Sequence, residues 1–226
     1  MQDFFWRVSL GTRYSSGVES KLSQDIKRID TILKSELPRY DWAIDTSAEF
    51  IKSNGWFSAG RSYIKSLLSI YAYHQPKSFN DGSIVNINNG WLKIANSRNY
   101  HHFFPKAYLE KKIDWEYKNF WINHILNITI VDDYLNKREI AAKAPSNYMK
   151  KFSKQNPELD LTMKTHLIND LETFGIWDDN YDAFLNNRAK ALSREIKKRI
   201  IVQEVDRTME AELTEEGETN EITSTT

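Results

Sequence analysis

Two adjacent histidines, His101 and His102, are the residues of this chain best suited to chemistry. They lie in a short aromatic run, residues 100–104, that Pro105 stops, and this pattern predicts a strand. Neighbouring side chains of a strand point to opposite faces, so adjacent histidines share a site only where the strand ends and its backbone turns. Neutral imidazole can accept a proton or bind a metal ion at pH 7, because its ordinary pKa is about 6.5.

Two asparagines, Asn127 and Asn136, follow the histidines along the chain. Asn127 opens a run rich in β-branched residues, 127–131, which predicts a second strand that pairs with the first in antiparallel orientation. Asp132 and Asp133 can cap a helix after it, with Asn136 in about its first turn and the helix packed across the strands. A histidine pair, a strand opened by asparagine and a helix with a second asparagine resemble the ββα-metal (HNH) nuclease fold.

The resemblance becomes specific when further segments are included. These are residues 101–109, Ile122-Asn123, 126–129, Asn136-Lys137 and 144–148, with Phe5-Trp6 and 13–16 upstream and 164–168 and 181–185 downstream. Together they resemble the C-terminal part of the GmrSD-like family, which comprises modification-dependent (type IV) restriction endonucleases. Members combine a ParB-like N-terminal domain with an HNH-type C-terminal domain. The resemblance covers most of residues 1–203.

The resemblance implies a role for each polar residue of the pattern. His101 corresponds to the first metal ligand and His102 to the general base. Asn136 corresponds to the second metal ligand, through its amide oxygen, and Asn127 to an asparagine that bridges backbone groups and holds the loop bearing the base. Phosphodiester hydrolysis needs an activated water, charge neutralisation at phosphorus and stabilisation of the departing 3′-oxygen, and one divalent ion can supply the last two.

The neutral ligand at His101 affects the choice of metal, because many HNH enzymes carry aspartate at that position. We expect Mg²⁺, with Mn²⁺ or Ni²⁺ as alternatives, since these softer ions tolerate imidazole better. Lys106, Lys137 and Arg138 can contact DNA phosphates, although an ordinary surface role fits the sequence equally well. His124 is expected to pack or to face solvent, and His166 is expected to pack in the core.

The sequence as a whole predicts a mostly helical α+β protein with a small ββα-metal (HNH) unit embedded between helical segments. We expect an N-terminal helical region over residues 1–98, the HNH unit over 99–150, C-terminal helices over 151–203 and an acidic disordered tail over 204–226. Apolar residues spaced by three and four predict one helix with a single buried face, at Val18, Leu22, Ile26, Ile29, Leu33 and Leu37. A second set is basic and lies on the last helix, where it forms either a solvated face or a phosphate-tracking surface: Arg188, Lys190, Arg194, Lys197, Lys198 and Arg199.

The net charge of zero conceals an asymmetry along the chain. Residues 204–226 hold eight acidic residues and one basic residue, so residues 1–203 carry an excess of seven positive charges. A basic body suits a polyanionic partner such as DNA. The tail is rich in Glu and Thr, which predicts disorder; it either solubilises the chain or shields the basic surface from non-specific DNA.

Several classes of protein are excluded by composition. The chain has no cysteine, which rules out disulfides and paired-cysteine zinc sites. No apolar run approaches about 18 residues and the N-terminus lacks a signal-peptide pattern, so we expect a cytoplasmic protein that does not interact with a membrane.

The resemblance also implies partners. The family's ParB-like domain binds nucleotide and confers dependence on modified DNA, and its Asp-Gly-Gln-Gln-Arg motif does not occur in this sequence. We therefore expect a fragment, or a natural protein whose partner carries the ParB-like domain, acting on DNA and in particular on base-modified phage DNA. Two alternatives stay open: a degenerate HNH domain that only binds DNA or a protein, and a helical interaction subunit whose histidines are structural.

Overall fold

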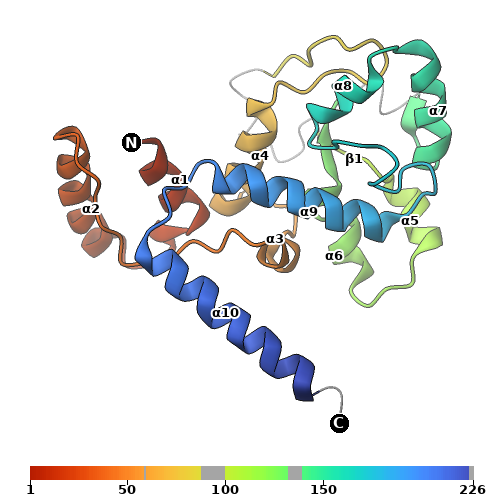
Figure 1. The fold of residues 1–226 in the computed structure, drawn as a ribbon. Coiled ribbons are helices and arrows are strands. Elements are labelled where there is room, and N and C mark those ends of the chain that lie inside the picture. Colours follow the sequence, from red (N-terminus) through yellow and green to blue (C-terminus); the bar gives the residue numbers. More distant parts are fainter. Residues whose placement is uncertain (59, 88–99, 132–138, 224–226) are drawn as a thin grey trace. The chain divides into compact units, whose positions relative to one another are not determined.

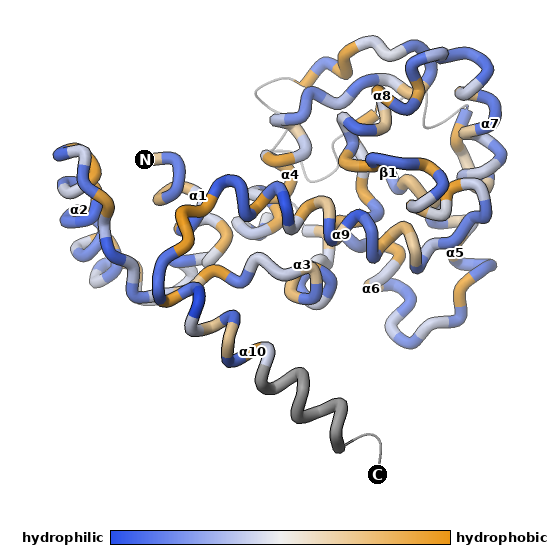
Figure 2. The backbone as a smooth tube through the Cα atoms, viewed as in Figure 1, coloured by the Kyte–Doolittle hydropathy of each residue, from blue (hydrophilic) through white to orange (hydrophobic). Residues whose placement is uncertain are grey.

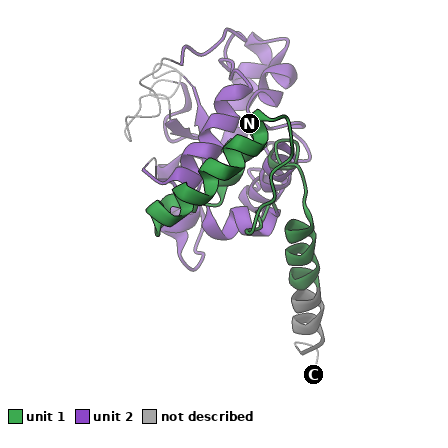
Figure 3. Cartoon of the chain, turned by 90° about the vertical axis from the view of Figure 1, so that its left-hand side faces the viewer, with its two compact units in different colours: residues 1–46, 196–226 green, residues 47–195 purple. Residues whose placement is uncertain are grey.

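The computed structural model shows a chain of helices with one small sheet (Figure 1), grouped into two compact units (Figure 3). Unit 1 contains residues 1–46 and 196–226, and unit 2 contains residues 47–195. The structure describes residues 1–58, 60–87, 100–131 and 139–223, with side chains described as far as Thr214. These two units do not follow the four segments predicted from the sequence. Unit 2 combines most of residues 1–203, and unit 1 joins the two ends of the chain.

Unit 1 is built from segments at both ends of the chain. Its elements are α1 (Gln2–Leu10), the 3-10 helix η1 (Arg13–Ser15), α2 (Val18–Leu33) and α10 (Glu204–Thr223). Arg7 on α1 is fully buried and forms an ion pair with Asp206 on α10. Asp206 also accepts a hydrogen bond of 3.1 Å from the backbone N–H of Ile44. One buried carboxylate thus connects three parts of unit 1.

The predicted disorder of the acidic tail is wrong for residues 204–223, which form α10. The physical reason lies at its first turn, where Asp206 is only 4% exposed. Its Oδ2 accepts the N–H of Gln203 at 2.8 Å, so the same carboxylate that pairs with Arg7 also orders the start of the helix. Composition counted Asp206 among solvated charges, whereas it is a buried partner of a distant arginine.

The apolar face predicted to be buried on α2 is instead exposed. Ile26 is 66% exposed and Leu33 is 73% exposed, and hydrophobic residues recur along α2 among hydrophilic ones (Figure 2). The buried residue of α2 is polar: Asp25 accepts hydrogen bonds from Arg13 at 2.6 Å and from Arg28 at 2.9 Å. Periodicity identifies an apolar face of the helix, but it does not show whether another element covers that face.

Unit 2 contains most of the helices and the sheet, so the fold is α+β and mostly helical, as predicted. Its elements are α3 (Ala48–Asn54), α4 (Ser62–Tyr73), β1 (Tyr100–His102), α5 (Lys106–Lys112), α6 (Lys118–Ile122), the 3-10 helix η3 (Ile125–Asn127), β2 (Ile128–Ile130), α7 (Pro145–Gln155), α8 (Leu159–Lys164) and α9 (Tyr181–Lys197), whose last two residues belong to unit 1. No helix among the described residues is long and apolar enough to cross a membrane.

The two strands pair in antiparallel orientation, as predicted, although each is shorter than expected. His101 lies opposite Thr129, and His102 lies opposite Ile128. The predicted start of the next helix, with Asp132, Asp133 and Asn136, falls in residues 132–138, which lie outside the described residues.

An aromatic cluster around Phe103 forms the core of unit 2. The ring of Phe103 stacks on Phe184 at 4.9 Å between centroids. It also makes edge contacts with Phe79 at 6.0 Å and with Tyr148 at 5.8 Å. These rings are at most 1% exposed. Burial of each stabilises the fold by about 1.5–3 kcal/mol, so the residue that follows His102 is anchored firmly in the core.

Candidate active site

The two histidines lie on opposite faces of β1. His101 is buried and His102 is half-buried, which is the ordinary alternation of a strand. The strand runs through both of them, and its backbone turns only afterwards, at Phe103 and Phe104. His102 is therefore the more solvent-accessible member of the pair.

The ring of His102 is oriented by Asn123, the residue after α6. Nε2 of His102 lies 3.2 Å from Oδ1 of Asn123. The other side-chain atom of Asn123, Nδ2, donates to the carbonyl of Asn119 at 3.0 Å, which turns Oδ1 toward the imidazole. Because a carbonyl oxygen can only accept, Nε2 carries the hydrogen and Nδ1 is left as the basic nitrogen of His102. Sequence reasoning named Asn123 only within the family resemblance and gave it no role.

His102 is held in its neutral form. Burial lowers its pKa below the ordinary value of about 6.5, and the charge of Lys106 lowers it further, while the hydrogen bond to Asn123 opposes both. A neutral imidazole at pH 7 is the state that a general base requires. Lys106 itself lies on the exposed side of α5, where its Nζ is 3.8 Å from Glu110.

Asn127 is fully buried and bridges three backbone groups. Its Oδ1 accepts the N–H of Phe104 at 2.8 Å, and its Nδ2 donates to the carbonyls of Phe104 and Ile122, each at 3.0 Å. Its own carbonyl accepts the N–H of Phe103 at 2.7 Å. The side chain thereby ties the backbone after the histidine pair to the end of α6.

Three side chains from different elements hold three carbonyls of the histidine segment. Thr129 Oγ1 donates to His101 O at 3.2 Å, Tyr148 Oη donates to Phe103 O at 2.6 Å, and Asn127 holds Phe104 O. Tyr148 belongs to α7, so this contact ties the helix after the strand pair to the residue that follows His102. A backbone held at residues 101, 103 and 104 gives His102 a defined position, which a catalytic group needs.

Three residues of the predicted metal and phosphate set, Asn136, Lys137 and Arg138, fall outside the part of the chain that the structure describes. Within residues 1–58, 60–87, 100–131 and 139–223, no group of three or more His, Cys, Asp or Glu side chains is arranged to hold a metal ion. Of the two predicted metal ligands, His101 is the one among the described residues, and it is buried in β1.

His124 is a structural histidine with both ring nitrogens in use. Nδ1 accepts the N–H of Leu126 at 3.1 Å, so Nε2 donates to the carbonyl of Lys52 at 2.9 Å. Burial lowers the pKa of His124 to about 4. Gly55 makes room for the ring, since a Cβ there would lie 2.0 Å from it.

His166 is also structural, as expected. Its Nε2 donates to the carbonyl of Lys77 at 2.7 Å, and its ring packs against Phe79 at 4.9 Å between centroids. Burial lowers its pKa to about 3. Neither His124 nor His166 is available for catalysis in this arrangement.

The basic residues of α9 and of the two positions after it do not form one surface. Lys190, Arg194, Lys197 and Lys198 are exposed, but Arg188 is 1% exposed and Arg199 is 8% exposed. A solvated or phosphate-tracking role is therefore wrong for these two arginines. Amphipathic spacing cannot reveal this, because it treats every cation as a surface residue.

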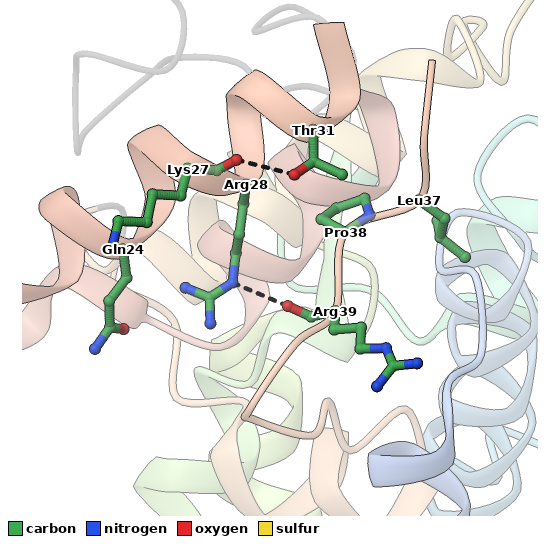
Figure 4. Close-up of a pocket in the computed structure, with 7 residues that line it drawn as sticks. All are labelled: Gln24, Lys27, Arg28, Thr31, Leu37, Pro38 and Arg39. Carbon is green, nitrogen blue, oxygen red and sulfur yellow. Dashed lines mark hydrogen bonds between the residues drawn. The ribbon is translucent and has the colours of Figure 1, made fainter. Parts of the chain in front are cut away.

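A groove in unit 1 is lined by basic side chains, namely Lys27, Arg28 and Arg39, and by no predicted catalytic residue (Figure 4). It lies between α2 and residues 37–39, and it is lined by Gln24, Lys27, Arg28, Thr31, Leu37, Pro38 and Arg39. The guanidinium of Arg28 is occupied, because its Nε donates to the carbonyl of Arg39 and its other nitrogens pair with Asp25 and Asp41. The residues that line the groove include no histidine, carboxylate or hydroxyl–base pair that could act on a bond.

His102 thus lies at the end of a two-stranded antiparallel sheet in a mostly helical α+β unit, beside backbone that the buried Asn127 holds. The chain belongs to the family described as GmrSD restriction endonucleases, C-terminal domain, whose sequence model matches residues 38–195. This confirms the resemblance found in the sequence and makes the chain a restriction-endonuclease-related nuclease domain. No curated protein and no solved structure matches the chain.

Proposed function

We propose that this domain hydrolyses DNA phosphodiester bonds by an HNH-type mechanism with a divalent metal ion. The observation that carries the proposal is the arrangement of His102: it is half-buried, neutral and hydrogen-bonded to Asn123. Membership of a restriction-endonuclease family supports DNA as the substrate class.

His102 acts as the general base in this proposal. Its Nδ1 takes the proton of the attacking water, and the ring becomes an imidazolium. The hydrogen bond between Nε2 and Asn123 Oδ1 persists and favours the charged form, so it lowers the cost of that proton transfer. Asn127 contributes indirectly, by fixing the backbone at Phe104.

By the family resemblance, the metal ion would be held by His101 and by the amide oxygen of Asn136; because the two histidines alternate along β1, this assignment requires the His101 ring to reach the site of His102 at the end of the strand. When bound, the ion would neutralise charge on the phosphate and stabilise the departing 3′-oxygen. We propose Mg²⁺, with Mn²⁺ or Ni²⁺ as alternatives suited to an imidazole ligand. Lys106, Lys137 and Arg138 are the proposed contacts to DNA phosphates.

The substrate in this proposal is base-modified phage DNA, and the biological role is anti-phage restriction in the cytoplasm. A ParB-like nucleotide-binding domain or subunit would supply recognition of the modification. The support for this step is the sequence resemblance. The alternative is a degenerate HNH domain that only binds DNA or a protein.

Plasmid nicking tests the proposal. Supercoiled DNA, unmodified or carrying modified cytosines, is incubated with the chain in Mg²⁺, Mn²⁺, Ni²⁺ or EDTA. The proposal predicts metal-dependent nicking that His102→Asn abolishes. His74→Asn, which removes a half-buried imidazole at the end of α4, should retain activity. DNA binding without cleavage under every condition would favour the degenerate domain.

A further inference from the structure

Arg188 on α9 is a buried cation with no part in the chemistry described above. Its Nη1 donates to the carbonyl of Leu126 at 2.6 Å. The guanidinium lies over the ring of Tyr71, 4.7 Å from its centroid, and near the ring of Phe184, at 5.7 Å. Among the described residues, no carboxylate lies within ion-pair distance of Arg188, although it is 1% exposed.

Such burial is costly. Removing a cation from water costs several kcal/mol, which aromatic contacts and one carbonyl offset only in part. Burial accordingly lowers the pKa of Arg188 from its ordinary value. A methionine or leucine would fill the same volume without this cost, so packing alone does not account for an arginine here.

The groups that Arg188 and Tyr71 hold are consecutive. Tyr71 Oη donates to the carbonyl of Ile125 at 3.2 Å, and Arg188 holds the carbonyl of Leu126. Both carbonyls belong to η3, the short turn that ends at Asn127. The next residue along the chain is Asn127, whose side chain forms hydrogen bonds with the backbone of Phe104.

We propose that Arg188 is a positioning residue of the nuclease site. It fixes η3, η3 places the side chain of Asn127, and Asn127 holds the backbone two residues after His102. The planar guanidinium is suited to this task, because it stacks on Tyr71 while directing a donor at the Leu126 carbonyl. This inference rests on the proposed function, since the residue it positions is the proposed base.

The test compares Arg188→Met and Arg188→Lys with two controls on the same helix. Leu192→Ala opens a cavity at a fully buried position of α9, and Arg194→Met removes an exposed arginine. Nicking gives kcat and the KM for DNA, at a temperature where circular dichroism shows each variant folded. Amide hydrogen exchange of Phe104, relative to Phe152 in α7, reports on the Asn127 contact without requiring cleavage.

Arg188→Met should lower kcat by about 10–100-fold, leave KM within about threefold, and raise the relative exchange of Phe104 at least about tenfold. Arg188→Lys should recover part of both losses. Leu192→Ala should lower the melting temperature but leave kcat and relative Phe104 exchange near wild type, and Arg194→Met should change none of them.

A folded Arg188→Met variant with wild-type kcat and wild-type Phe104 exchange would overturn the inference. So would a loss of kcat with unchanged Phe104 exchange. Should Arg188→Met not fold, Arg188→Lys decides in the same way: faster relative exchange of Phe104 supports positioning, and unchanged exchange overturns it. A wild-type chain that does not cut contradicts the proposed function, whereas the exchange measurement still tests the link from Arg188 to Phe104.

Discussion

Asn127 and Phe104 exchange two hydrogen bonds, from the backbone N–H of Phe104 to Oδ1 and from Nδ2 to the Phe104 carbonyl. An amide side chain thus pairs with a backbone residue as a strand neighbour would. The pairing extends the contact between the strands beyond β1 and fixes the turn after His102.

Asn127→Asp should destabilise the domain and abolish cleavage. The variant keeps an acceptor for Phe104 N–H but loses the donor to two carbonyls, of Phe104 and Ile122, and buries a carboxylate. Each buried carbonyl left unpaired costs about 1–3 kcal/mol, so the loss of both donors should lower the free energy of unfolding by roughly 2–6 kcal/mol. Urea denaturation measures it, with exposed Asn147→Asp as the matched control. A loss below about 0.5 kcal/mol would contradict the proposed bridge.

Asn123→Leu should reduce catalysis without weakening DNA binding. It removes the oxygen that orients the His102 ring, so kcat should fall by about 10–100-fold while KM stays near wild type. Asn119→Leu is the matched control, because the exposed Asn119 contributes only its carbonyl to this network. Equal kcat for both variants would show that His102 does not depend on Asn123.

The parts of this site that could be predicted from the sequence are those determined by residues close to one another along the chain. The strand pair follows from β-branched and aromatic residues beside a proline, all close in sequence. The His101, His102 and Asn127 pattern was also visible, because spacing along the chain preserves it. Arg188 and Asn123 were not visible in these roles, since a cation on an amphipathic helix and an asparagine after a short helix are ordinary surface features.

The same distinction explains the errors in unit 1. Periodicity of α2 reports an apolar face, whereas burial requires a second element that periodicity does not contain. The acidic composition of residues 204–226 does not distinguish the buried Asp206 from the exposed acidic residues. The partner of Asp206, Arg7, lies near the other end of the chain. Both predictions failed at long-range contacts.

Asp206→Asn should destabilise unit 1, contrary to the behaviour of a disordered tail. Arg7 would keep its contact with Asp3, 3.3 Å away, but lose its main counter-ion in a buried site. Breaking a buried pair costs roughly 3 kcal/mol, so the melting temperature should drop by several degrees. Glu210→Gln is the control, because its pairing with Lys197 at 3.7 Å is half-exposed. Unchanged melting of Asp206→Asn would show that α10 does not stabilise the fold.

Acid should destabilise unit 2 through His124 and His166. Burial lowers their pKa values to about 4 and about 3 in the folded chain, against about 6.5 when unfolded. The unfolded chain therefore binds more protons, and stability is lost as pH falls below about 6.5. Each histidine should contribute a slope of up to about 1.4 kcal/mol per pH unit.

Urea denaturation between pH 7 and pH 5 measures this slope. His124→Gln should make it shallower, because it removes one of the two rings that are buried in the neutral form. A stability that is flat across this range would contradict neutral burial of the two rings.

Metal titration of three variants tests the central claim most directly. His102→Ala should lower the nicking rate by roughly 10²–10⁴ with little change in DNA affinity, since a general base contributes about that much. Raising Mg²⁺ or Mn²⁺ should partly restore His101→Ala and Asn136→Ala, because more ion can refill a weakened site. It should not restore His102→Ala, because an ion cannot replace a lost proton acceptor. Rescue of His102→Ala by metal, with none for His101→Ala, would contradict the assignment of His102 as the base.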